Sequence, residues 1–391
     1  MAAKKKDPPT PKPASKKARS KPMSNMDKVT LREIRACAEH VHRAIIKLDK
    51  PELQFPERSL RNAKYDKKEG FFQMGRARKE RTLTVNTVKS FAQTLKLMAL
   101  SKDMVEEDDF ATKREAYYVS KNWGEAKFQE QPESDACMDD IEALFSLEGV
   151  TREQLRFYPE EHGGAVAGEL IVIDRDPETD REVRIDCTGF ATGSYSIPHS
   201  VEHLKFETSA KFVIAIETGG MFQRLNNHKF WRKSKCILIE TMGVPTRATR
   251  RFIRKLADDC KIPVYAFNDC DPYGISNIYR TLKVGSGNAV HLNQFFCVPQ
   301  ARYLGVTPQD IIDFKLEDAT HPLQDVDIKR ARDALKNDPF FQAHKEWQKA
   351  IEQMLKMGVR AEQQALAKWG LNFVIDEYLP VKLKAVEKFL P

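Results

Sequence analysis

The chain has 391 residues, 41% of them hydrophobic, so it can bury a sizeable core, and its length suggests about two or three domains. The formal charge is +8, but residues 1–30 hold nine Lys or Arg against two Asp, which leaves +1 for everything after. No apolar stretch approaches the roughly 20 residues that a membrane-spanning helix requires, which excludes a transmembrane helix. Seven cysteines stand singly without a CxxC pair, so we expect neither disulfides nor a zinc site, and a reducing compartment fits best.

Residues 1–28 form a basic tail rich in Lys and Pro. The tail lacks an apolar segment, so we expect neither a signal peptide nor a membrane anchor, and its composition predicts disorder. A Lys-rich arm can hold duplex phosphates loosely through counterion release. A solubilising leader without a specific partner is the alternative interpretation.

Residues 29–151 are predicted to form a domain of small helices and short strands. Asp27–His42 is expected to be helical, and strand-like stretches lie within Phe71–Val85, on either side of a basic loop at 76–81. Asn86 is expected to cap a helix with an apolar stripe at helical spacing, which comprises Val88, Phe91, Leu95, Met98 and Ala99. This arrangement suggests a winged-helix, CAP-like DNA-binding module.

One helix start in this domain is marked clearly. Thr112 and Glu115 have the spacing of a capping box, which places Tyr118 in the second turn. Arg114 precedes Tyr118 by four residues and shares its face if the helix continues. A phenol with a pKa of ~10 needs a nearby cation or base to act as a nucleophile, and a guanidinium would help. The alternative is that Tyr117 and Tyr118 are ordinary half-buried aromatics and Arg114 a solvated side chain, and spacing does not decide.

Further along, Met138–Leu147 is predicted to be a helix, and Thr151 is a possible cap for another. From Gly168 the pattern changes, because Leu170–Ile173 and Val183–Ile185 flank turn-forming residues and predict a β-hairpin. A second domain is therefore expected to begin near this point.

This second domain, residues 152–391 with a core at about 211–320, alternates strands and helices. The pattern predicts a parallel sheet covered by helices, in an α/β fold. Beyond Ile328 the chain is expected to be helical and charged. The predicted core elements are strands at Phe212–Ile216, Cys236–Ile239 and Val264–Phe267, with helices after Gly220, from Thr246 and through Ile275–Leu282.

Three acidic residues follow two of these strands, namely Glu217, Asp269 and Asp271. In open parallel sheets, ligands gather at the carboxyl ends of the strands. Mg²⁺ prefers oxygen ligands and is typically held by one or two carboxylates plus waters and phosphate oxygens. The alternative is structural, because Asp before Pro often starts a turn and Asp commonly caps a helix.

The helix predicted from Thr246 carries an arginine stripe, formed by Arg247, Arg250, Arg251 and Arg254. Their spacing places four guanidiniums on one face, which suits contact with a DNA phosphate backbone. The alternative is a solvated helix face with salt bridges to nearby acids.

With these residues identified, the chain closely resembles the family of DNA topoisomerase VI A subunits and meiotic break-forming transesterases. The likeness spans most of the chain. Its markers, in order, are Thr112–Tyr118, Ile216–Leu225, Gly243–Phe252, Val264–Gly274, Gly285–Ala289, Ala361–Leu366 and Tyr378–Pro380.

The resemblance implies a winged-helix (CAP-like) domain that carries the tyrosine and a Toprim α/β domain with a parallel sheet. Tyr118 would attack a DNA phosphodiester to leave a transient 5′-phosphotyrosyl double-strand break, with Arg114 as its helper. Glu217, Asp269 and Asp271 match the acidic positions that hold one or two Mg²⁺ ions.

The resemblance also implies partners. These are double-stranded DNA, a second copy of the chain whose metal site meets this copy's tyrosine, and an ATPase B subunit in an A2B2 heterotetramer. The chain has no GxxxxGK[ST] loop, so ATP would be bound by the B subunit. The implied activity is duplex passage with relaxation or decatenation of DNA, in the cytoplasm or at the nucleoid.

Two other functions stay open at this point. One is a break-forming transesterase that does not reseal the break, and the other is a non-catalytic DNA-binding protein with the Toprim fold. The sequence departs from the family pattern at two places: Thr218 stands where some relatives have Lys, and Met242–Val244 replaces a Gly/Lys-rich turn.

Overall fold

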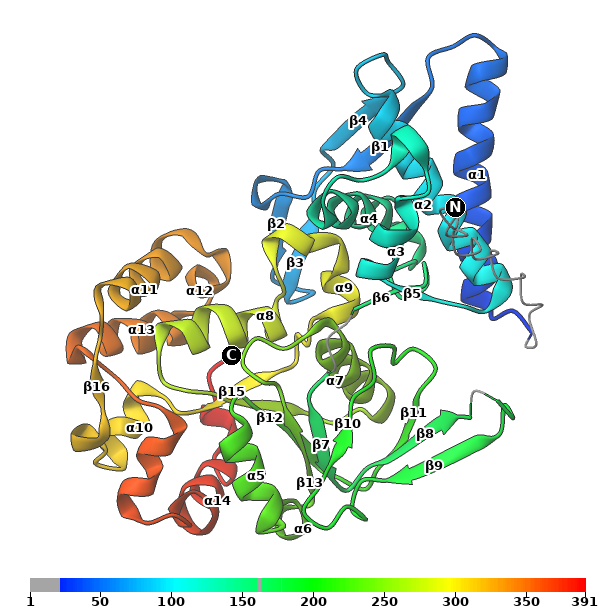
Figure 1. Ribbon diagram of the computed structural model, residues 1–391. Helices are drawn as coiled ribbons and strands as arrows, with labels where there is room; N and C mark the ends of the chain where they lie inside the picture. Colours follow the sequence, from blue (N-terminus) through cyan, green and yellow to red (C-terminus); the bar gives the residue numbers. More distant parts are fainter. Residues whose placement is uncertain (1–21, 160–162, 177) are drawn as a thin grey trace, which may run out of the picture. The chain divides into compact units, whose positions relative to one another are not determined.

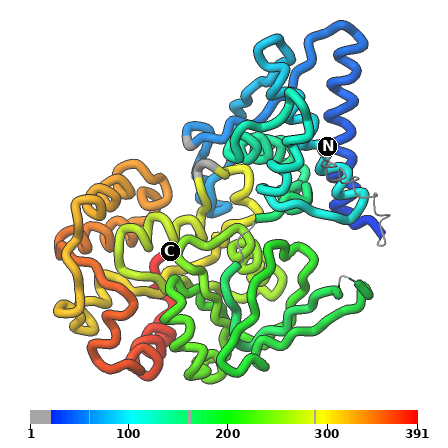
Figure 2. The backbone as a smooth tube through the Cα atoms, in the orientation of Figure 1, coloured from blue at the N-terminus to red at the C-terminus, as the bar shows by residue number. Residues whose placement is uncertain are grey.

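The computed structural model describes residues 22–159, 163–176 and 178–391, so most of the basic tail lies outside the described residues. The chain forms two compact units, one made of Met1–Phe55 and Glu80–Tyr158 and the other of Pro56–Lys79 and Pro159–Pro391. The chain therefore passes between the units three times, and Figure 2 allows this path to be followed by colour.

The first unit is built mainly from helices that bury apolar faces against one another. Its core includes Leu97, Met98, Met138 and Ile141, each almost fully buried. Short strand pairs, β1 with β4 and β5 with β6, complete the unit. Its elements are α1 (Asn25–Ile46), β1 (Glu52–Pro56), β4 (Arg78–Thr82), α2 (Val88–Glu107), β5 (Ala111–Thr112), α3 (Lys113–Ser120), η2 (Gly124–Ala126), α4 (Gln131–Phe145), η3 (Ser146–Glu148) and β6 (Phe157–Tyr158).

The second unit is organised around a six-stranded sheet in the order β10-β7-β13-β12-β14-β15. The strands from β13 to β15 run parallel to one another, as the strand-helix alternation predicts, and their side chains are largely buried. β7 and β10 extend the sheet antiparallel. The strands are β7 (Ala165–Gly168), β10 (Tyr195–Ser196), β12 (Phe212–Ile216), β13 (Cys236–Glu240), β14 (Val264–Phe267) and β15 (Arg302–Gly305).

The connections of this sheet diverge at its centre. From β12 the chain passes through α5 (Gly219–Asn227) to β13 on one side, and from β13 through α7 (Arg247–Cys260) to β14 on the other. Right-handed crossovers in opposite directions put the two helices on opposite faces, as Figure 1 shows. The neighbours β12 and β14 thus form a topological switch point, where ligands bind in open α/β sheets.

The predicted β-hairpin is confirmed as part of a smaller sheet. β8 (Ile171–Arg175) pairs antiparallel with β9 (Glu182–Asp186), and β11 (Lys205–Glu207) pairs with the other edge of β8. A second hairpin, of β2 (Ala63–Asp66) and β3 (Phe71–Met74), follows η1 (Leu60–Asn62) and also belongs to the second unit.

The rest of the second unit is mostly helical, as expected for the C-terminal part. Its elements are α6 (Phe230–Ser234), the π-helix η4 (Gly274–Tyr279), α8 (Arg280–Lys283), η5 (Gly287–Leu292), α9 (Asn293–Phe296), α10 (Pro308–Asp313), η6 (Glu317–Ala319), β16 (His321–Pro322), α11 (Asp325–Asn337), α12 (Pro339–Ala343), α13 (Lys345–Met357), β17 (Val359–Arg360), η7 (Gln363–Trp369), the π-helix η8 (Val374–Tyr378), α14 (Leu379–Leu383) and η9 (Val386–Lys388).

Several predicted boundaries differ from the structure. Thr151 caps no helix, because its backbone N–H donates to the Gln154 side chain and a turn follows. The cap before α2 is Thr87 rather than Asn86. The helix predicted from Met138 begins earlier, at Gln131, where Pro132 sits in the first turn as helices favour. None of the helices in the described ranges is long and apolar enough to cross a membrane.

Candidate functional site

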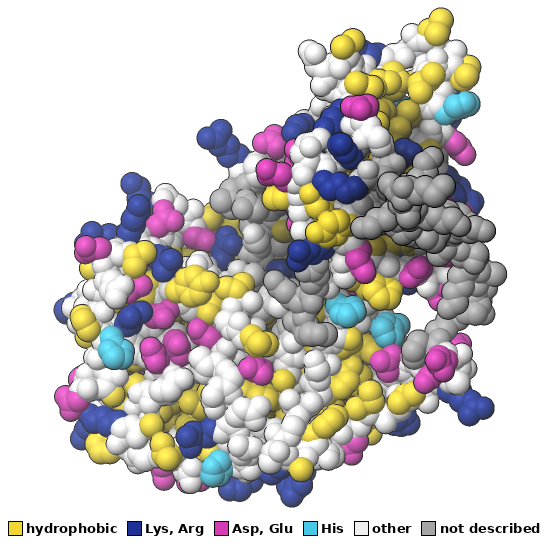
Figure 3. All heavy atoms as spheres, in the orientation of Figure 1, with side chains coloured by type: hydrophobic (Ala, Val, Ile, Leu, Met, Phe, Trp, Pro, Cys, Tyr) yellow, Lys and Arg dark blue, Asp and Glu magenta, His cyan; other side chains and the backbone are white. Residues whose placement is uncertain are grey.

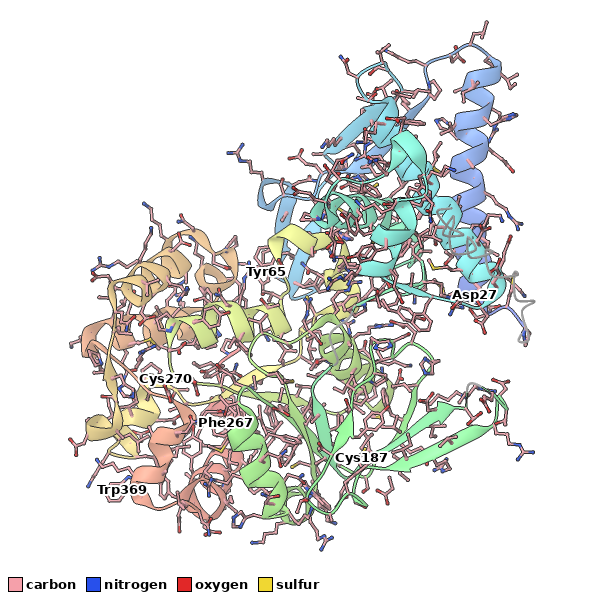
Figure 4. All side chains as sticks on the ribbon, viewed as in Figure 1. Asp27, Tyr65, Cys187, Phe267, Cys270 and Trp369 are labelled. Atoms are coloured by element: carbon pink, nitrogen blue, oxygen red, sulfur yellow. The ribbon has the colours of Figure 1, made fainter. Side chains whose placement is uncertain are left out.

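The predicted carboxylates come together at the switch point of the sheet. Glu217 follows β12, and Asp269 and Asp271 follow β14, its parallel neighbour. The Glu217 backbone N–H donates to the Phe267 carbonyl at 3.0 Å, which continues the ladder to the point where the side chains emerge. Figure 4 labels Phe267 and Cys270 at this end of β14.

Backbone donors fix one oxygen of each carboxylate. The Asp269 N–H donates to Glu217 Oε2 at 3.0 Å, and the Gly274 N–H donates to Asp271 Oδ1. The Gln363 N–H donates to Asp269 Oδ1 at 2.8 Å. These bonds orient the three side chains, and among the residues that the structure describes no basic side chain is bonded to any of them, so backbone donors hold the site.

Gly274 leaves open the space that these carboxylates share. A Cβ at this position would stand 3.3 Å from both Asp271 Oδ1 and Glu217 Oε2, and 3.0 Å from the Asp269 carbonyl oxygen. The Gly274 φ is not in the left-handed region, so the backbone itself does not require glycine there. The structure instead indicates that glycine keeps this small acidic space clear of a methyl group.

All three carboxyl groups have raised pKa values, so each is a weaker acid than usual. Burial, with repulsion from Asp269 and Asp271, raises the pKa of Glu217 to about 8. Burial, with repulsion from Asp271, also raises the pKa of Asp269 to about 6, and burial raises that of Asp271. The Arg360 guanidinium opposes the rise at both aspartates. Three acids that resist ionisation together indicate a place for a cation.

The donor set fits a hard divalent cation such as Mg²⁺. In the described ranges no three His, Cys, Asp or Glu side chains form a ready-made metal cage. Mg²⁺ does not need one, since one or two carboxylates, waters and substrate phosphates complete its shell. Buried carboxylates facing the space left by Gly274 supply what such a partly open site requires.

A C-terminal segment that includes Ala361 and Gln363 bonds to the loops that carry the acids. The sequence alone did not predict a role for this segment. The fully buried Gln363 accepts from the Thr218 hydroxyl at 2.7 Å and donates through Nε2 to the Phe267 carbonyl at 2.7 Å. Cys270 and Ala361 exchange two backbone hydrogen bonds. Gln363 thus connects both acidic loops. The only sequence signal was the family marker Ala361–Leu366, which carried no chemistry by itself.

Tyr118 lies on α3 of the first unit. The capping box predicted there is confirmed, because Thr112 and Glu115 exchange side chain to backbone hydrogen bonds. The helix continues to Ser120, so Arg114 and Tyr118 share a face. The Tyr118 side chain is 57% exposed, although it is a large aromatic residue.

The two tyrosines of the pair differ in environment. Tyr117 is partly buried, its hydroxyl donates to the Gln129 carbonyl at 2.9 Å, and Lys121 Nζ lies 4.1 Å from its ring centroid. Within the described ranges, the Tyr118 hydroxyl and the exposed Arg114 guanidinium form no hydrogen bond or ion pair. The second tyrosine is therefore the accessible one.

The arginine stripe of α7 is engaged within the second unit. Arg251 pairs with both oxygens of Glu202 at 2.7 and 2.8 Å and donates to the Phe295 carbonyl. Arg254 bonds Asp258 and the Cys297 carbonyl, and Arg247 and Arg250 lie over the Phe296 ring. These contacts agree with the alternative of a helix face paired with nearby acids, and phosphate binding there stays a prediction.

Comparison with known families covers both units. The family model for the Toprim domain of topoisomerase 6 A subunits and Spo11 matches residues 212–383. A model described as an all-beta domain in the DNA topoisomerase VI alpha subunit matches 160–210, and one described as type IIB DNA topoisomerase matches 89–156. The first match confirms the predicted Toprim domain.

Curated proteins resemble the chain over most of its length. The A subunit of type 2 DNA topoisomerase 6 from Methanocaldococcus jannaschii is 53% identical over 90% of this chain and 94% of its own. The A subunits of the same enzyme from Methanothermobacter thermautotrophicus and Pyrococcus abyssi are 37% and 35% identical, over 86% and 87% of this chain and 92% and 90% of their own.

Proposed function

The chain belongs to the family of DNA topoisomerase VI A subunits, and on that premise we propose that it transiently breaks and rejoins both strands of DNA through Tyr118. As a member of this family it is an enzyme of the type II DNA topoisomerase class. Its relatives carry the topoisomerase name, which favours an enzyme that reseals its breaks over one that leaves them open.

The proposal assigns a part to each domain. A basic tail, predicted at 1–28, precedes a winged-helix (CAP-like) domain, predicted at 29–151, whose α3 presents the tyrosine. Residues 56–79 of that range pack in the second unit. The Toprim domain, predicted at 152–391, presents the acidic site. The helices and short strand pairs of the first unit support the winged-helix assignment.

In the proposed reaction the Tyr118 phenolic oxygen attacks a backbone phosphorus. The bond from phosphorus to the 3′ oxygen breaks, the new bond is a 5′-phosphotyrosyl ester, and the leaving 3′ oxygen takes up a proton as the phenol loses one. Arg114, on the same face of α3, favours the phenolate and holds the phosphate. The ester retains the bond energy of the phosphodiester, so attack by the 3′ hydroxyl reseals the strand.

Glu217, Asp269 and Asp271 would hold one or two Mg²⁺ ions, which when bound supply charge stabilisation at the scissile phosphate. The chain's own residues prepare this place: Gln363 and the backbone donors orient the carboxylates, and Gly274 keeps their shared space open. The single observation that most strongly supports the proposal is the convergence of three acids after the neighbouring parallel strands β12 and β14, where oxygens of Glu217, Asp269 and Asp271 all border the space at Gly274.

The proposed assembly follows the family. Double-stranded DNA is the substrate, two copies of the chain pair so that one tyrosine meets the other copy's acidic site, and an ATP-binding B subunit completes an A2B2 heterotetramer. Energy for duplex passage then comes from ATP bound by the B subunit.

Trapping the covalent adduct tests this function. The chain is incubated with its ATPase partner, Mg²⁺, nucleotide and supercoiled DNA, then denatured, and the peptide that carries DNA is mapped. We expect Tyr118→Phe to remove the adducts and to reduce relaxation by roughly 10³-fold or more, because the variant lacks the phenolic oxygen of the proposed nucleophile.

Tyr117→Phe is the matched control, since its hydroxyl is already bonded to a backbone carbonyl. That variant should still form adducts. Persistent protein-linked DNA in Tyr118→Phe, or a map that places DNA on another peptide, would reassign the nucleophile.

A further inference from the structure

Residues 56–79, here called the basic hairpin segment, carry a charge that the rest of the folded chain lacks. The segment holds eight Lys or Arg against three Asp or Glu, a net +5, whereas the whole chain after residue 30 carries only +1. Seven of its basic side chains are exposed, namely Arg61, Lys64, Lys67, Lys68, Arg76, Arg78 and Lys79.

One face of the hairpin is anchored firmly to the second unit. Tyr65 and Phe72 face each other across the two strands, and the Tyr65 ring also packs on Phe340, at 6.0 Å between centroids. Arg280 lies 4.7 Å from the Phe72 ring centroid, and Asn293 donates to the Phe72 carbonyl at 3.0 Å. Figure 4 labels Tyr65 on this hairpin.

The base and the tip of the hairpin are also fixed. At the base, the Asn62 side chain donates to the Glu57 and Ala77 carbonyls and accepts from the Ala77 N–H. At the tip, Asp66 Oδ1 accepts from the Lys68 and Glu69 N–H groups. The hairpin is thus a rigid platform, and its charged side chains project from an ordered backbone.

The other face points its cations outward. Lys64 pairs in register with Gln73 on the face opposite Tyr65 and Phe72, and both are exposed. Lys67 and Lys68 stand at the tip, and neither has an ion-pair partner among the described residues. By contrast, the arginines of α7 are engaged with acids, carbonyls and a ring of their own unit.

We propose that the outward face of the basic hairpin segment binds the phosphate backbone of duplex DNA. This inference rests on the proposed function. Phosphate contacts by Lys and Arg position a protein on DNA without reading its sequence. An acidic protein surface fits less well, because interface cores favour aromatic anchors and disfavour Lys, and no large hydrophobic side chain described in this segment is exposed.

The test compares Lys64→Gln/Lys67→Gln/Lys68→Gln with a matched control, Lys345→Gln/Lys349→Gln/Lys356→Gln, which neutralises three exposed lysines of α13. Both are made in the full chain with its ATPase partner, and the basic tail is retained in every protein. Binding of a short duplex is measured by fluorescence anisotropy over a salt series, without Mg²⁺ or nucleotide.

We expect the hairpin variant to bind roughly 5- to 50-fold more weakly at ~0.1 M salt, with a slope of log K against log salt smaller by about 2 to 3. The control should change affinity less than about twofold. Equal affinities and slopes in the two variants would overturn the proposal. Loss of the ATPase partner from the hairpin variant, with DNA binding unchanged, would also overturn it and assign the surface to a protein.

Because the binding measurement needs no cleavage, its outcome is independent of Tyr118. Absence of covalent adducts in the unaltered complex would refute the proposed function and leave the comparison of the two lysine variants intact. Circular dichroism and thermal melting of both variants establish that the fold is retained.

Discussion

At the scale of single residues, Gly274 shows how a missing side chain can define a site. The space that its Cβ would fill is bordered by oxygens of two carboxylates and of a backbone carbonyl. A methyl group there would displace the very atoms that are expected to hold a cation and its waters. Glycine is therefore as much a part of the acidic site as the acids themselves.

We predict that Gly274→Ala weakens Mg²⁺ or Mn²⁺ binding by roughly 10- to 100-fold, as other changes next to metal ligands do. The measurement is the metal-dependent rise in melting temperature of the complex, together with adduct formation. Gly220→Ala is the control, because a Cβ at Gly220 meets no atom within 4 Å. Equal metal affinity in both variants would show that the space beside Glu217 is not used.

At the scale of elements, α7 shows that a charged stripe can serve the fold. The Arg251 side chain is only 23% exposed and makes a two-pronged pair with Glu202. The helix thereby fastens to the segment before β11 and to α9. The spacing of the arginines predicts that they share one helix face, but it does not predict the residues that contact them, such as Glu202 and Phe295.

We predict that Arg251→Ala lowers the free energy of unfolding by about 1–3 kcal/mol, because it leaves Glu202 and the Phe295 carbonyl without their donor. Chemical denaturation measures this loss, and the exposed Arg232, changed to Ala, is the control. If Arg251→Ala instead leaves stability unchanged and reduces the salt slope of DNA binding by about 1, the stripe contacts phosphates after all.

Much of the second unit was predictable at this scale. The buried strands β12, β13 and β14, the crossovers between them and the acids after β12 and β14 follow from alternating apolar runs and from the rule that ligands gather at strand ends. The capping box of α3 also follows from local spacing, because Thr112 and Glu115 satisfy each other's backbone.

Contacts between residues distant in sequence were not predictable. Gln363 reaches Asp269 across 94 positions, and Asn293 reaches Phe72 across 221. Neither pair has a local pattern, since a Gln or an Asn in a polar sequence is usually exposed. The inclusion of residues 56–79 in the second unit is likewise a tertiary property that the composition of the segment does not reveal.

At the scale of the whole molecule, the excess positive charge lies in the first 30 residues, and the remainder of the chain is close to neutral. Basic and acidic side chains are interspersed over the face seen in Figure 3, in keeping with a near-neutral body. The buried acids Glu217, Asp269 and Asp271 affect stability, because burial in the folded chain raises their pKa values and so disfavours their ionised forms.

We predict that, without divalent metal, the free energy of unfolding falls by roughly 2–4 kcal/mol between about pH 5 and pH 8. The pKa of Glu217 is about 8 in the folded chain and near 4.5 when exposed, so the folded state holds the extra proton in that range. The stability from the neutral side chain is complete below the unfolded pKa and is lost as pH rises through the folded one.

Denaturant titrations of the unaltered chain and of Glu217→Gln, each at several pH values, measure this effect. The variant cannot ionise at this position, so its stability should change less over the range. Mg²⁺ should stabilise the unaltered chain more at pH 8 than at pH 6, since it favours the ionised acids. Identical pH dependence in both proteins would contradict the assignment.

The threefold passage of the backbone between the units bears on how the protein can be dissected. A fragment that starts at residue 159 spans the Toprim match but lacks Phe72, so Arg280 and Asn293 would lose their apolar and carbonyl neighbours to solvent. A fragment limited to the Toprim match would therefore expose the apolar surface that Tyr65 and Phe72 cover in the full chain. A truncation that keeps the native fold of the second unit must also include the β2–β3 hairpin. Proteolysis at one of the three connections between the units leaves the units joined by the other two connections.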